Sequence, residues 1–249
     1  MRALWIPFLA LLTSCATMNC EHYSGWCDPI RETAGDSWRF GQLSTNVYER
    51  GDSFEISNFA IKIEDYPNST INFYASLFRL KDGKLALVYR GTDSLADFLT
   101  GNNPFLQMQN SYGLDVFDRA VKEHGMISVV AGHSLGGGIA MHVSLNRPDV
   151  TAFSFNGSPV FRKKSGEFEN ERYSIVEYGE ILKAARVFGR SATQYYTSIG
   201  CTEDGGVIRQ HSIRLLAECL TQIAATQSME ADASLRQNKI EREYVLPES

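Results

Sequence analysis

The sequence contains no run of lysine and arginine, no internal repeat and no low-complexity segment. Its 249 residues carry a formal net charge of −5. These features argue against nucleic acid as a partner, because nucleic-acid recognition requires a basic surface that contacts phosphates. With 43% hydrophobic and 21% charged residues, the composition is that of an ordinary globular domain. A domain of this length buries a large core and needs neither disulfides nor a metal in order to fold.

The first apolar stretch, residues 3–12, is too short to span a bilayer. It follows a short basic start and is therefore typical of the apolar region of a signal peptide. The stretch ends in Leu-Thr-Ser-Cys at Cys15, which resembles the lipobox of bacterial lipoproteins. The resemblance implies cleavage before Cys15, acylation of that cysteine and, with Ala16 following, an outer-membrane lipoprotein on the periplasmic or surface face. The alternative is an ordinary cleaved signal with an incidental cysteine.

The remaining cysteines are even in number, which fits an oxidising compartment such as the periplasm. Proximity along the chain favours the disulfides Cys20–Cys27 and Cys201–Cys219. The alternative is that Cys219 is a buried thiol on an apolar helix face, which is common for cysteine.

Apolar periodicity predicts an α/β fold from about residue 54 onward. Strands are predicted within residues 58–66, 71–80, 85–92, 126–132, 150–159, 172–180 and 192–200. Helices are predicted at residues 111–125, 135–145 and 211–225. Alternation of strands and helices with short links favours a mostly parallel central sheet with helices on both faces. A hairpin turn at residues 81–84 indicates antiparallel strands at one edge.

We predict a single folded domain at residues 38–226, without an interdomain linker. A signal peptide at residues 1–14 and a lipidated tether at residues 15–37 precede it. Residues 227–249 are polar and charged, and we expect them to form a surface helix or a loose tail.

A Gly-x-Ser-x-Gly motif at residues 132–136 lies between a predicted strand and a predicted helix. This is the setting of a nucleophile elbow, in which glycines let the turn close tightly and the serine hydroxyl rises above the sheet edge. Ser134 is therefore the candidate nucleophile, and an inert serine in a glycine-rich turn is the alternative. A serine hydroxyl is a poor nucleophile by itself, so the motif requires a base elsewhere in the chain.

Histidine is scarce, with five residues in the chain. His211 is the candidate base, because it follows Ser134 in the required order of nucleophile, acid and histidine and stands in a loop just before a helix. His133 occupies the spacer position of the elbow. The other histidines lie in the tether, at a helix end and within the helix after the elbow: His22, His124 and His142.

The acid should lie between Ser134 and His211, after a strand. Glu180 is the best candidate, because it follows a predicted strand and Gly179, which permits a tight turn. Glu177 is the alternative, although its position within the strand favours facing solvent or pairing with a basic group. The acid orients the histidine and supports its positive charge, and glutamate can replace aspartate in this role.

An oxyanion hole needs two backbone donors. The N–H of Leu135, the residue after the nucleophile, is one candidate. The loop Arg90-Gly91-Thr92, which ends a predicted strand, offers the other. Gly91 allows the backbone to lie close to a substrate, and Thr92 supplies an N–H and a hydroxyl.

Together these residues resemble the class 3 lipase family, the fungal-lipase-like branch of the α/β-hydrolases. The motifs are Arg-Gly-Thr at residues 90–92 with Asp97 following, Gly-His-Ser-Leu-Gly-Gly at residues 132–137, and Asn-Gly-Ser-Pro at residues 156–159. The resemblance covers about residues 55–220. It implies the α/β-hydrolase fold and hydrolysis of acyl esters, typically glycerolipids, without cofactor or metal. It also implies an oxyanion hole from Thr92 and Leu135, and it places Glu180 where the family has aspartate.

The family's lid over the active site has one candidate here, the apolar side chains of residues 97–113. The alternative is that these side chains belong to the core. Without a clear lid, the sequence does not separate lipase from phospholipase or carboxylesterase. We therefore expect a membrane-tethered serine ester hydrolase that acts on lipids or other acyl esters. An acyltransferase or thioesterase with the same residues and a catalytically silent envelope lipoprotein are the alternatives.

Overall fold

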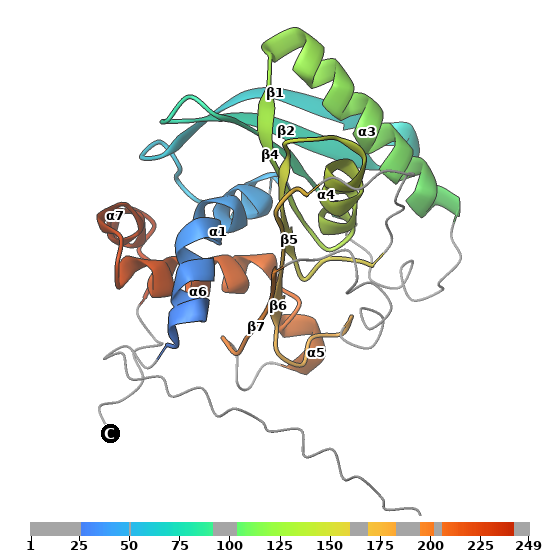
Figure 1. Ribbon diagram of the computed structural model, residues 1–249. Helices are drawn as coiled ribbons and strands as arrows, with labels where there is room; N and C mark the ends of the chain where they lie inside the picture. Colours follow the sequence, from blue (N-terminus) through green and yellow to red (C-terminus); the bar gives the residue numbers. More distant parts are fainter. Residues whose placement is uncertain are drawn as a thin grey trace, which may run out of the picture.

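The computed structural model describes residues 26–49, 51–91, 104–159, 169–182, 195–201 and 206–241. In this part of the chain, seven strands form one sheet in the order β1 to β7 (Figure 1). The strands are β1 (Ala60–Asn68), β2 (Phe73–Leu80), β3 (Leu85–Tyr89), β4 (Ile127–His133), β5 (Thr151–Phe155), β6 (Arg172–Glu177) and β7 (Tyr195–Ile199). The first three strands pair antiparallel, and β3 to β7 pair parallel. The predicted α/β fold, with a mostly parallel sheet and antiparallel edge strands, is confirmed.

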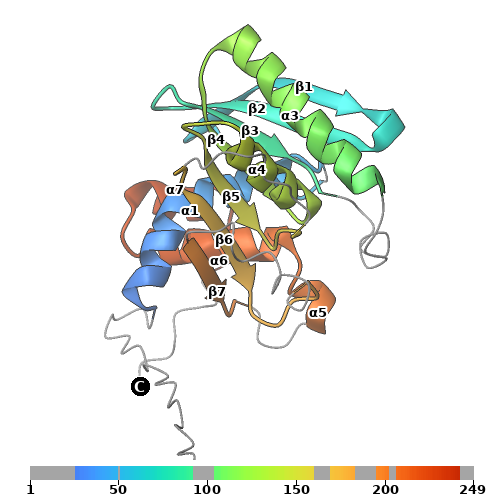
Figure 2. The same cartoon turned by 45° about the vertical axis from the view of Figure 1, so that its right-hand side comes forward.

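Helices cover both faces of this sheet. They are α1 (Asp28–Asn46), α3 (Pro104–His124), α4 (Leu135–Asn146), α5 (Gly206–Arg209), α6 (Ile213–Ala225) and α7 (Met229–Gln237), with a short 3-10 turn, η1 (Ser69–Ile71). Figures 1 and 2 show α3 and α4 on one face and α1, α6 and α7 on the other. Parallel strands are joined by right-handed crossovers, so α3 and α4, which connect β3 to β4 and β4 to β5, fall on the same face.

Two apolar clusters lie on opposite sides of the sheet, because neighbouring side chains of a strand alternate between its faces. Leu87 of β3 packs with α3 and α4, whereas the next residue, Val88, packs with α1 and α6. In β4, Val130 and Ala131 divide in the same way. Both faces of the sheet are therefore covered by buried apolar side chains. A functional site can form only at the ends of the strands, which the helices leave uncovered.

Helix α1 begins earlier than the predicted domain boundary at residue 38. Its first half lies within the predicted tether, yet Ala34 and Trp38 are fully buried, and α1 packs against α6. Much of its buried face consists of small polar residues rather than apolar ones, and this weakened the helical signal. Ser37 and Thr45 satisfy their hydroxyls by donating hydrogen bonds to the backbone carbonyls of Thr33 and Gly41. The folded domain therefore includes residues 28–37.

Helix α7 lies within the segment that we expected to be a surface helix or a loose tail. It is a helix, and it is packed through Ala231 and Leu235, which are buried. Gln42 of α1 donates hydrogen bonds to Thr221 of α6 and Ser234 of α7. A buried polar bridge thus joins the three helices of this face.

The lid candidate at residues 97–113 overlaps the start of α3. From Pro104 onward the segment is helical, with Asn110 fully buried and Met108 48% exposed. Residues 97–103 lie outside the described residues. None of the described helices is long and apolar enough to cross a membrane.

Candidate active site

Ser134 stands at the turn between β4 and α4 and has a strained backbone, with φ 56° and ψ −122°. Such a conformation costs about 1–3 kcal/mol and persists only where the surroundings hold it. Here the Ser134 N–H donates to the carbonyl of Phe155, and the Ser158 N–H donates to the carbonyl of Ser134, at 3.0 and 2.9 Å. The turn also requires glycine at position 136, since a Cβ there would lie 2.1 Å from the carbonyl oxygen of Tyr89. The structure therefore places Ser134 in a braced elbow, as the motif predicts.

His211 and Glu180 form a buried pair. The Nδ1 atom of His211 lies 2.8 Å from Oε2 of Glu180, and the two side chains are 5% and 0% exposed. The Leu182 N–H donates to the same carboxylate oxygen at 3.0 Å. Among the described residues, Nε2 of His211 is buried and has no hydrogen-bond partner. The pair therefore holds the imidazole by one nitrogen, and the other nitrogen is left without a partner among the described residues.

Glu177, the alternative acid, has a different role. It is 3% exposed, so the expectation that it faces solvent is wrong. Its Oε1 accepts a hydrogen bond from the Cys201 N–H at 2.7 Å, which links the ends of β6 and β7. The structure thus brings Glu180, and not Glu177, to the ring of His211.

Asn156 anchors the loop that carries His211, a role that the sequence analysis did not assign. Its side-chain NH₂ donates to the carbonyl of Gln210 at 3.1 Å, and its Oδ1 accepts from the Glu177 N–H at 2.8 Å. Asn156 is fully buried. The sequence feature that could have indicated this role is the position of Asn156 in the Asn-Gly-Ser-Pro motif. An amide at the end of β5 can reach both the neighbouring strand, β6, and the loop that carries His211.

A disulfide joins Cys201 to Cys219, as predicted, with a Cα–Cα distance of 5.9 Å. It connects the end of β7 to α6, and His211 lies between its two cysteines in the chain. Cys27 is also disulfide-bonded. Its predicted partner Cys20 and the predicted lipidation site Cys15 lie outside the described residues.

Of the two predicted oxyanion donors, Leu135 lies among the described residues and Thr92 does not. Leu135 is fully buried and opens α4, where backbone N–H groups have no partner within the helix and the helix dipole favours negative charge. Thr92 lies outside the described residues, but Gly91 directly before it does not. A Cβ on Gly91 would lie 3.1 Å from Cβ of Ser134. The loop after β3 therefore reaches the nucleophile, as an oxyanion donor from that loop requires.

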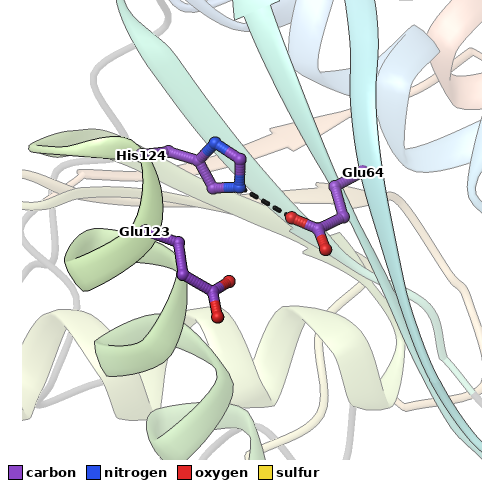
Figure 3. A group of neighbouring side chains, drawn as sticks. All are labelled: Glu64, Glu123 and His124. Carbon is purple, nitrogen blue, oxygen red and sulfur yellow. Dashed lines mark hydrogen bonds and ion pairs between the residues drawn. The ribbon is translucent and has the colours of Figure 1, made fainter.

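One group of side chains has the composition of a metal site. Glu64, Glu123 and His124 offer ligand atoms within 4.8 Å of one another (Figure 3). His124 Nε2 lies 2.6 Å from Oε2 of Glu64, and this hydrogen bond lowers the pKa of Glu64. Glu123 and His124 end α3, which leads to the amino end of β4, whereas Ser134 follows the carboxyl end of that strand. We interpret it as a contact that joins the end of α3 to β1.

No protein-family model and no curated protein matches the sequence. Among solved structures, a lipase from Rhizopus microsporus var. chinensis is similar, with a TM-score of 0.50 and 11% identity over 64% of this chain and 71% of that chain. Lipase II from Rhizopus niveus has a TM-score of 0.49 and 15% identity, over 64% of this chain and 77% of that chain. A triacylglycerol lipase from Penicillium expansum has a TM-score of 0.49 and 14% identity, over 70% and 82%. At 11% identity, the similarity to the lipase from Rhizopus microsporus var. chinensis shows a shared fold.

Proposed function

We propose that this protein is a serine ester hydrolase that cleaves acyl esters, with lipids as its substrate class. The observation that carries the proposal is the buried bond between His211 and Glu180, formed on the domain whose elbow presents Ser134. The order of serine, glutamate and histidine along the chain is the order of this class of hydrolase. The similarity to the fungal lipases concerns the fold and is consistent with this chemistry.

In the proposed mechanism, Nε2 of His211 takes the proton of the Ser134 hydroxyl as the oxygen attacks the ester carbonyl. Glu180 holds the ring in this orientation and stabilises the positive charge that it gains. The backbone N–H groups of Leu135 and Thr92 donate to the negative oxygen of the tetrahedral intermediate. His211 then passes the proton to the leaving alcohol, and a water molecule, activated by the same histidine, releases the acid from the acyl-enzyme.

We also propose that the mature chain is anchored to the outer membrane of a bacterium through an acylated Cys15. The support is the lipobox-like sequence, which ends at that cysteine. Acyl chains on the anchor would hold the domain at a lipid surface. Metabolic labelling with a palmitate analogue checks this directly, because Cys15→Ser should abolish incorporation and release the protein from the membrane fraction.

An ester panel tests the proposed function. A soluble form that begins after Cys15 should release p-nitrophenol from p-nitrophenyl esters of graded chain length, and free fatty acid from triacylglycerol or phospholipid. The dependence of kcat/KM on chain length and head group then identifies the substrate class. Failure to hydrolyse any ester, together with failure of a fluorophosphonate probe to label the folded protein, would contradict the proposal. Formation of a new ester in the presence of an alcohol would instead identify an acyltransferase.

Reduction of the Cys201–Cys219 disulfide is expected to lower esterase activity without unfolding the core. The bond ties the end of β7 to α6 on either side of His211, so breaking it loosens the support of the proposed base. Activity and circular dichroism should be followed together in reductant, with free thiols counted. The double variant Cys201→Ala/Cys219→Ala is the control, since any further effect of reductant on it belongs to the disulfide of Cys27. Unchanged activity after verified reduction would show that the bond does not support the site.

A further inference from the structure

The hydroxyl of Tyr48 lies between two loops of the proposed active site. Tyr48 follows the C-terminus of α1, on a part of the chain that contributes none of the proposed catalytic groups. Its oxygen accepts a hydrogen bond from the Gly91 N–H at 3.2 Å and lies 2.8 Å from Nδ1 of His133. The other ring nitrogen of His133, Nε2, lies 2.8 Å from the carbonyl oxygen of His211. One hydrogen-bonded series thus runs from the loop after β3, past the nucleophile elbow, to the backbone of the proposed base.

The direction of each bond in this series follows from its chemistry. A carbonyl oxygen can only accept a hydrogen bond. Nε2 of His133 therefore carries a hydrogen and donates a hydrogen bond to the backbone carbonyl of His211. In a neutral imidazole the other nitrogen, Nδ1, is then an acceptor, and the Tyr48 hydroxyl donates to it. The lone pairs of Tyr48 remain for the Gly91 N–H. With a neutral His133 in this tautomer, each hydrogen bond of the series has one donor and one acceptor.

Close packing holds the series in place. His133 is 6% exposed, and its ring lies against that of His211 with a centroid distance of 4.7 Å. The ring of Tyr48 contacts that of His133 edge-on at 5.9 Å. Gly91 has no room for a side chain, because a Cβ would lie 2.6 Å from both the Tyr48 hydroxyl and the His133 carbonyl oxygen. A shift in any one member would displace the next.

We propose that Tyr48 and His133 are positioning residues that set the oxyanion loop and the base loop relative to Ser134. This inference rests on the proposed function and deepens it. His133 is thus more than the spacer of its motif, since its ring contacts that of His211 and its Nε2 bonds to the His211 backbone carbonyl. The alignment of donors and base affects the transition state more than substrate binding, so its loss should lower kcat and leave KM nearly unchanged.

Tyr48→Phe in the full-length protein, purified in detergent, tests the proposal. The variant keeps the ring and removes only the hydroxyl. Misplacement of catalytic groups by about 1 Å costs on the order of 10²-fold, so we expect kcat for a p-nitrophenyl ester to fall by roughly ten- to a hundredfold. Labelling of Ser134 by a fluorophosphonate should slow in parallel, because it depends on the same base and donors. Tyr66→Phe is the matched control, since its hydroxyl donates to Glu64 of the same strand, β1, which β2 and β3 separate from β4, and activity should stay at the wild-type value.

His133 provides an independent variant pair. His133→Leu removes the donor to the His211 carbonyl, whereas His133→Gln retains an N–H near the position of Nε2. We expect the glutamine variant to recover most of the activity that the leucine variant loses, although both melt at lower temperature than wild type. A purely structural role also predicts reduced thermal midpoints, but it predicts an unchanged kcat for both variants in the protein that remains folded.

The outcomes separate this inference from the proposed function. A wild-type protein that neither hydrolyses esters nor reacts with the fluorophosphonate probe would contradict both the proposed function and the positioning role. A wild-type esterase in which Tyr48→Phe retains full kcat, or loses no more than Tyr66→Phe, would overturn the positioning role alone. Should His133→Leu fail to fold, the comparison of the two Tyr→Phe variants decides by itself.

Discussion

Replacing Ser134 with alanine is expected to lower kcat/KM for ester hydrolysis by at least about 10⁴-fold, leaving only what binding and the oxyanion donors supply. Without the hydroxyl, no acyl-enzyme can form, and His211 has no nucleophile to deprotonate. Alanine carries the same Cβ as serine, so the strained φ of 56° is no less tolerable and the fold should survive. Initial rates on a p-nitrophenyl ester, with circular dichroism of the same sample, measure the effect.

A buried serine of the neighbouring helix serves as the control for this substitution. Ser144 lies in α4, and its hydroxyl donates to the carbonyl of Val150 at 2.7 Å, away from the carboxyl end of β4. Ser144→Ala should lower the thermal midpoint and keep wild-type turnover. If Ser134→Ala retains esterase activity comparable to that of the wild type and of Ser144→Ala, the proposed mechanism is wrong, whatever the stability of the variant.

The second large effect is expected at Glu180. Glu180→Gln retains the shape of the side chain and an oxygen that can accept from Leu182, but it removes the negative charge beside His211. The imidazolium that forms during attack then lacks its counter-charge, and where the amide NH₂ faces Nδ1 in place of the oxygen, the ring takes the wrong tautomer. Loss of the acid in comparable triads costs about 10⁴-fold in kcat, and we expect a decrease of that order here.

Glu177→Gln is the matched control and also the test of the alternative acid. An amide oxygen at position 177 can still accept from the Cys201 N–H, so the link between β6 and β7 persists. We expect kcat to stay near the wild-type value. If Glu177→Gln abolishes turnover while Glu180→Gln does not, the assignment of the acid is reversed. Equal, small effects of both would mean that neither carboxylate supports the base.

The strand and helix pattern was largely predictable, because it follows from local apolar periodicity. The predicted segments overlap β1 to β7 and the helices α4 and α6, and Ser134 lies at the strand-to-helix turn that its motif requires. The pairing of His211 with Glu180 was also predictable, since few histidines follow the nucleophile and a glycine turn separates Glu180 from its strand.

The residues that the sequence did not indicate act across long separations. Tyr48 meets His133 at a separation of 85 residues, and Asn156 meets the carbonyl of Gln210 at a separation of 54. Neither contact produces a periodic pattern in the sequence, because each depends on the tertiary packing of elements that are far apart in the chain. Helix α1 was missed for a different reason. Several of its buried residues are polar, and two of them, Ser37 and Thr45, donate to carbonyls of their own helix, so the segment resembles a loop in sequence.

The disulfide beside His211 has a consequence for the timing of activity. Cys201 is held twice, by its bond to Cys219 and by the carboxylate of Glu177, so the support of the proposed base is complete only after thiol oxidation. In a reducing cytoplasm that bond does not persist. For a chain exported as proposed, we therefore expect low esterase activity before export and full activity only after the bond has formed.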